Sequence, residues 1–100
     1  MNMNSTHDTL NNVKVRNMIG HSGEPVKNQF IIRTDEGTYF QSYDSIIAFR
    51  AFEGPTYLDK NKWDYSITTG KYRNMFLGED KKATEKRIKD GTYKLVDLNN

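Results

Sequence analysis

The chain of 100 residues contains no cysteine, only two prolines and only two histidines. Without cysteine, neither a disulfide nor a thiolate–metal site can hold the fold together. No apolar run comes near the roughly 18 residues that a membrane-spanning helix needs. These absences predict a small soluble protein of the cytoplasm, with no membrane association, and they give no reason to expect a cofactor.

Residues suited to catalysis are also scarce. Nucleophilic catalysis commonly pairs a hydroxyl or thiol with an imidazole base, and only His7 and His21 could supply that base. His7 lies in a polar amino-terminal stretch, His21 lies in a glycine-rich loop, and no Gly-x-Ser-x-Gly motif is present. No pair of His or Asp residues has the spacing of a metal site. We therefore expect a protein that is not an enzyme, with no catalytic or metal-binding residues.

Positive charge, by contrast, is concentrated in the carboxyl-terminal third of the chain. The net charge is only +2, but residues 1–59 carry five Lys or Arg against seven Asp or Glu, a balance of −2. Residues 60–94 carry ten Lys or Arg against five Asp or Glu, a balance of +5. A basic carboxyl-terminal third could face an acidic partner or a phosphate backbone, or it could form an ordinary solvated surface.

Hydrophobic patterning predicts a disordered tail at residues 1–11 and a single domain at residues 12–100. Segments rich in β-branched and aromatic residues predict the strands. These segments are residues 13–19, 29–34, 38–43, 45–52, 56–59 and 92–98. Asp35-Glu36-Gly37 predicts a hairpin turn, with Gly37 in the left-handed position of a bulge.

Two short helices are predicted between the last two strands. In the first, Tyr72, Met75 and Phe76 share one face because their spacing is i, i+3, i+4. Gly78 stands where a helix commonly ends, and the second helix is expected at residues 81–89. Strands followed by helices and a final strand predict an α+β fold, with an antiparallel sheet of four to six strands and helices on one face.

The segment from Trp63 to Gly78 combines aromatic, hydroxyl and basic side chains within sixteen residues. A glycine and a lysine near a helix start could bind an anion, although the full phosphate-binding-loop pattern is absent. The hydroxyl groups could instead cap the helix by accepting a backbone N–H bond. Both interpretations stay open. The candidate binding residues in this segment are Trp63, Ser66, Thr68, Thr69, Lys71 and Arg73.

A second set of candidate binding residues lies on the second predicted helix. Lys82, Lys86 and Lys89 recur at i, i+4 and i+7, and Arg87 lies alongside them. Such a face could contact phosphates without reading sequence, while exposed aromatic rings could stack on unpaired bases. Against this, Glu85 stands four residues before Lys89 and would pair with it within the helix. Nucleic-acid binding is therefore the alternative prediction.

Protein binding accounts for the same features and is the preferred prediction. The chain has six Tyr, five Phe and one Trp, more aromatic side chains than so small a core requires. Tyr, Trp and Arg contribute most of the binding energy in many protein interfaces. Aromatic side chains left exposed on the sheet could therefore support capture of a partner or homo-oligomer formation.

Two segments of the chain also resemble a pattern found in small, uncharacterised phage-encoded domains. One runs from Trp63 to Leu77 and combines a Trp, a Ser-x-Thr-Thr motif and an aromatic-ended helix; the other runs from Gly37 to Ala48. The resemblance covers roughly residues 12–99. It implies an accessory viral protein that acts inside a bacterial host, for example by inhibiting a defence or taking over a host factor. The expected function is thus a non-enzymatic module that binds a host protein or self-associates.

Overall fold

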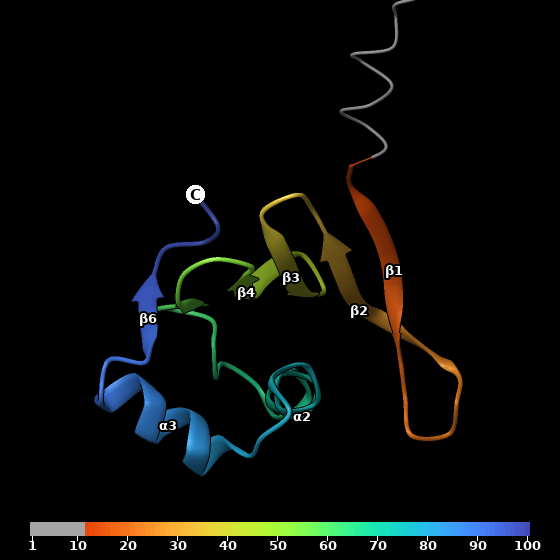
Figure 1. The fold of residues 1–100 in the computed structure, drawn as a ribbon. Coiled ribbons are helices and arrows are strands. Elements are labelled where there is room, and N and C mark those ends of the chain that lie inside the picture. Colours follow the sequence, from red (N-terminus) through yellow and green to blue (C-terminus); the bar gives the residue numbers. More distant parts are fainter. Residues whose placement is uncertain (1–11) are drawn as a thin grey trace, which may run out of the picture.

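The structure, a computed structural model, describes residues 12–100, so the disorder predicted for residues 1–11 lies outside the described part of the chain. Six strands and two helices follow one another in an α+β arrangement (Figure 1). In chain order they are β1 (Lys14–Ile19), β2 (Pro25–Arg33), β3 (Gly37–Ser42), β4 (Ser45–Ala51), β5 (Thr56–Asp59), α2 (Ile67–Leu77), α3 (Lys81–Lys89) and β6 (Tyr93–Val96).

All six strands form one sheet, in which spatial order equals chain order. Strands β1 to β5 pair antiparallel, but β6 pairs parallel to β5. The prediction of an antiparallel sheet is therefore wrong at its last strand, and the sheet is mixed. The reason is the connection: α2 and α3 carry the chain back along the sheet, as a parallel pair requires.

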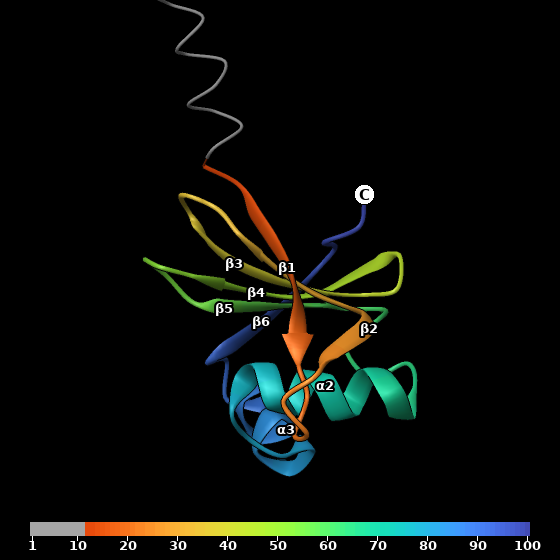
Figure 2. The same ribbon diagram turned by 90° about the vertical axis from the view of Figure 1, so that its right-hand side faces the viewer.

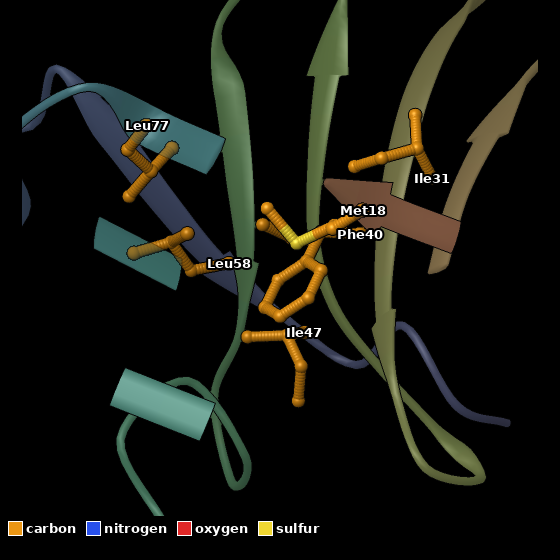
Figure 3. Close-up of a cluster of buried hydrophobic side chains, with 7 residues drawn as sticks. Met18, Ile31, Phe40, Ile47, Leu58 and Leu77 are labelled. Atoms are coloured by element: carbon orange, nitrogen blue, oxygen red, sulfur yellow. The ribbon is translucent and has the colours of Figure 1, made fainter. Parts of the chain in front are cut away.

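Both helices lie on the same side of the sheet and leave its other side open (Figure 2). The buried apolar side chains lie between the sheet and α2 (Figure 3). They are Met18, Ile31, Phe40, Ile47, Ala48, Leu58 and Leu77. The predicted apolar face of α2 is confirmed, since Tyr72, Met75 and Phe76 pack against this core.

The ends of the helices are set by local hydrogen bonds. Ser66 is the residue that caps α2, and its hydroxyl accepts the backbone N–H of Thr69 at 3.1 Å. Gly78 ends α2 in the left-handed conformation, with φ of 72°. Asp80 caps α3 in the same way as Ser66 caps α2. The helix boundaries therefore follow from residues that the sequence itself displays.

Gly37 has a different role from the predicted one. Its φ is 158°, a positive value that residues with side chains rarely adopt, although far from the roughly 57° of the left-handed position expected in a bulge. The turn is instead held by the Thr34 hydroxyl, which accepts the backbone N–H of Gly37 at 3.3 Å. A Cβ on Gly37 would lie 2.4 Å from the Arg50 carbonyl oxygen and 2.8 Å from the Phe49 ring. Glycine is needed there because β4 passes too close for any side chain.

The carboxyl-terminal residues return to the sheet. The Asn99 side-chain amide bonds both backbone groups of Ile46, accepting its N–H at 2.6 Å and donating to its carbonyl at 2.9 Å. Asp59 accepts the backbone N–H of Leu98 at 2.8 Å. Burial alone would raise the pKa of Asp59, but the hydrogen bonds that its carboxylate accepts outweigh burial and lower that pKa. These contacts tie the chain end to β4 and β5.

Within residues 12–100, no helix is both long and apolar enough to cross a bilayer. In the same part of the chain, no three His, Asp or Glu side chains are grouped so that they could hold a metal ion.

Candidate functional site

Arg73, one of the predicted binding residues, is a buried structural residue that is only 1% exposed. Its guanidinium donates to the Trp63 carbonyl at 2.8 Å, to the Asp64 carboxylate at 3.0 Å and to the Asn74 side chain at 2.9 Å. It also lies 5.1 Å from the centre of the Trp63 ring. Arg73 therefore holds the loop before α2 against the helix, and its guanidinium is already engaged in internal hydrogen bonds.

Thr69 and Ser66 are also used by the fold. Thr69 is fully buried, and its hydroxyl is joined by a 2.9 Å hydrogen bond to that of Ser42 on β3. Ser66 accepts the capping bond described above. Of the segment's hydroxyl and basic candidates, Thr68 and Lys71 are left exposed without such a structural role. The capping interpretation thus holds for Ser66, and Thr69 connects helix to sheet.

A hollow of about 510 Å³ lies at the start of α2, where the anion site was predicted. Lys71 lines it, but so does the Asp64 carboxylate, which Arg73 and Lys81 contact at 3.0 and 2.7 Å. Burial would raise the pKa of Asp64, but the hydrogen bonds from Lys81 and Arg73 outweigh it and lower that pKa. The hydrogen bond to Asp64 in turn raises the pKa of Lys81. An anion here would have to compete with Asp64 for the same cations.

On α3 the structure separates the predicted basic residues into two groups. Lys82, Lys86 and Lys89 are exposed and lie on the side of the helix opposite the buried Thr84. Arg87 instead pairs with Glu79 at 2.9 Å. Three lysines therefore remain free of ion pairs within the described chain, and Arg87 is engaged in an internal contact.

Glu79 is the centre of a polar cluster that joins the helices to β6. Its carboxylate accepts hydrogen bonds from Thr84 at 2.7 Å, from Tyr93 at 2.9 Å and from Arg87 at 2.9 Å. Burial would raise the pKa of Glu79, but these three bonds outweigh it and lower that pKa. These bonds join the start of α3 to β6, which gives the cluster a structural role.

The side of the sheet opposite the helices carries a continuous row of apolar and aromatic residues. Val15, Ile32, Tyr39, Phe49 and Tyr57 occupy directly paired positions on β1 to β5. The Tyr39 and Phe49 rings stack at 4.3 Å, and the Phe49 and Tyr57 rings at 6.3 Å. Both helices lie on the other side of the sheet (Figure 2). Val15 is exposed and the other four side chains are half-buried. We call these five residues the aromatic row.

At one end of the aromatic row the surface forms a hollow of about 600 Å³. Aromatic rings and carboxylates line it together: Phe49, Phe52, Tyr57, Asp35, Glu36 and Glu53. Among the ion pairs found in residues 12–100, none involves these three carboxylates. We call this feature the acidic hollow.

The aromatic row was not predicted residue by residue, although one signal for it exists in the sequence. Tyr39 and Phe40 are adjacent on one strand, and adjacent strand residues point to opposite faces of a sheet. Phe40 is fully buried in the core, so Tyr39 must lie on the other face. Which strands then lie beside Tyr39, and in which register, depends on the tertiary structure.

Comparison with known proteins gives a family but no function. A search of curated proteins found no significant match, and neither did a search of solved structures. One family model, described as a family of unknown function, matches residues 13–91 and so covers β1 to α3 and most of the described chain. The chain therefore belongs to the family of unknown function DUF8033.

Proposed function

We propose that this protein is a non-catalytic interaction module that binds a protein partner through the aromatic row. The observation that carries the proposal is the unbroken row of apolar side chains across five strands of an uncovered sheet face. The partner contributes apolar side chains to the row and basic side chains to the acidic hollow. In keeping with the resemblance to phage domains, we propose that the partner is a host protein. The alternative partner for the same face is a second copy of the chain.

The composition of this face supports binding. An antiparallel sheet with one solvated face normally alternates apolar residues toward the core with polar residues toward water. Here the outward positions of β2 to β5 hold Ile32, Tyr39, Phe49 and Tyr57 instead. Contiguous apolar surface of this kind marks interaction sites, and aromatic side chains are frequent anchors in them.

Charge favours a protein over a nucleic acid at this face. The acidic hollow places three carboxylates beside the rings on which bases would stack, and those carboxylates would repel phosphates. Helix α3, which carries the lysines, lies on the other side of the sheet. Its lysines therefore do not contact the phosphates of a nucleic-acid strand whose bases stack on the aromatic row. A partner with basic side chains meets neither difficulty.

Partner capture with matched variants tests the proposal. Val15→Asp places a negative charge on the aromatic row, at a side chain that is 61% exposed. The control, Ile67→Asp, places the same charge on the helix side of the sheet, at a side chain that is 94% exposed. We expect Val15→Asp to abolish capture of a partner from a nuclease-treated bacterial lysate, or self-association in sedimentation, while Ile67→Asp retains it. Glu53→Lys should weaken the same interaction. Equal behaviour of the Val15 and Ile67 variants would reject the proposal.

Nucleic-acid binding through α3 is the second candidate, because Lys82, Lys86 and Lys89 form an exposed basic face. Such binding would consist of phosphate contacts and would weaken steeply with added salt. A salt titration with single- and double-stranded DNA, repeated on the variant with all three lysines changed to Glu, tests it. Absence of binding by the unmodified protein at low salt would eliminate this candidate.

A further inference from the structure

Four basic side chains from the amino-terminal half gather on the helix side of the sheet, beyond the part that α2 covers. Lys14 on β1 is paired with Arg33 on β2, Arg33 with Thr38 on β3, and Thr38 with Arg50 on β4. Arg16 lies two residues along β1 from Lys14, on the same face. All four basic side chains are exposed. We call Lys14, Arg16, Arg33 and Arg50 the cationic row.

The cationic row is unfavourable for the isolated fold. Like charges at directly opposite positions of paired strands destabilise the pair, as at Lys14 and Arg33. No salt bridge within the described chain includes any of the four residues. The Arg33 guanidinium lies 6.0 Å from the centre of the Phe52 ring, but no carboxylate of the described chain neutralises the charges of the row.

These residues line a groove that has an apolar end. Two adjoining hollows of about 520 and 190 Å³ share Arg16, Ile31 and Thr38, so they form one continuous groove. Lys14 and Arg33 line the smaller hollow, and Arg50 lines the larger one. The apolar end of the larger hollow is formed by Met18, Ile31, Met75 and Phe76. No Asp or Glu side chain lines either hollow.

Arg50 is already held in place at this groove. Its guanidinium donates to the Phe76 carbonyl at 3.0 Å and lies 5.1 Å from the centre of the Phe76 ring. A guanidinium fixed in this way loses less freedom when it binds an anion, because its position is set beforehand. Thr38 adds a hydroxyl between the arginines.

We propose that this groove binds a small organic phosphate, with the phosphate on the cationic row and the apolar body between Ile31 and Phe76. Arginine pairs with phosphate through two parallel hydrogen bonds, and a doubly charged anion suits several unpaired cations better than a single carboxylate does. The volume of the groove lies within the range of small-molecule sites. The groove lies mainly on the helix side and the aromatic row on the other face, although Val15 at the edge strand borders both.

NMR titration of the labelled protein tests the site. The probes are AMP, decyl phosphate and inorganic phosphate, because an organic phosphate can come from a nucleotide or from a lipid. We expect AMP or decyl phosphate to bind with a Kd below about 1 mM and to shift the amide signals of Arg16, Ile31 and Phe76. Tighter binding of AMP would identify a nucleotide as the ligand, and tighter binding of decyl phosphate would identify an alkyl phosphate.

Matched substitutions make the result decisive. Arg16→Gln should weaken binding about tenfold, since hydrogen bonds to charged groups are worth about that factor. Lys86→Gln, a cation on α3 outside the groove, should leave the affinity unchanged. Arg33→Gln provides a second test at an exposed position. The proposal is overturned if neither organic phosphate binds, if inorganic phosphate binds equally well, or if Arg16→Gln and Lys86→Gln have the same effect.

Discussion

At the scale of single residues, Arg73 illustrates how a basic side chain can serve the fold alone. Its charge is buried, and it is balanced by the Asp64 carboxylate and by hydrogen bonds to Trp63 and Asn74. Breaking a buried ion pair costs more than an exposed pair contributes, because one charge is left without its partner. Arg73 should therefore matter for stability.

We predict that Arg73→Met lowers the free energy of unfolding by about 3 kcal/mol, because the bonds to Trp63, Asp64 and Asn74 are lost together. Lys71→Met, an exposed control two residues earlier, should change it by less than about 0.5 kcal/mol. Urea unfolding followed by the fluorescence of Trp63, the chain's one tryptophan, measures both. Similar values for the two variants would contradict the structural role of Arg73.

The sequence could identify Arg73 and Thr69 as noteworthy but could not assign their roles. Both are candidate binding residues on the sequence alone, with helix capping as the alternative for Thr69, because polar residues in a segment of mixed composition are usually exposed. Their burial depends on Ser42 and Asp64, one on a distant strand and one in the preceding loop. Ser66 was easier, because a capping residue acts on its own helix and its partner is only three residues away.

At the scale of elements, two glycines differ in whether their surroundings leave room for a side chain. Gly37 begins β3 where the backbone of β4 lies against it, and a Cβ would overlap the Arg50 carbonyl oxygen. Gly70 lies within α2, where a Cβ would meet its nearest neighbour, an Arg73 side-chain nitrogen, at 3.6 Å, an ordinary contact distance. The same substitution should therefore have opposite effects at the two positions.

We predict that Gly37→Ala lowers the free energy of unfolding by about 2 kcal/mol, since β3 and β4 must separate to make room. Gly70→Ala should instead raise it by up to about 1 kcal/mol, because alanine favours a helix more than glycine does. Chemical unfolding of both variants provides the measurement. A stabilising Gly37→Ala would show that β4 does not approach Gly37 as described.

Most elements could be predicted because their signals are local. The β3–β4 segments, the ends of α2 and the extent of α3 all depend on residues within a few positions of one another. The direction of β6 could not be predicted from its four residues. It depends on how α2 and α3 cross the sheet, and a strand sequence does not record whether its neighbour runs parallel or antiparallel.

At the scale of the whole molecule, the sheet separates two surfaces. Its open face carries the aromatic row with the acidic hollow, and its helix side carries the cationic row and the lysines of α3. Val15 and Arg16 are neighbours in sequence on β1, but they lie on opposite faces because side chains alternate along a strand. One strand thus contributes to both proposed sites.

We predict that the two sites act independently. Glu53→Lys, at a residue that lines the acidic hollow and not the groove, should weaken partner capture without changing the affinity for AMP or decyl phosphate, and Arg16→Gln should do the reverse. The two measurements already described, lysate capture and NMR titration, check this on both variants. Loss of both activities in either variant, with the fold intact by circular dichroism, would show that the sites are coupled or are one site.

By itself the sequence determined the α+β class, the end of α2 at Gly78, the apolar face of α2 and the hairpin between β2 and β3. Each of these depends on spacing within one element or on a turn between neighbours. Only the tertiary structure decided that β6 runs parallel to β5, that Arg73 is buried, and that Lys14, Arg33 and Arg50 lie in one row with Thr38 between the two arginines. These features depend on the pairing of distant segments, where the register of one strand against another sets which side chains meet.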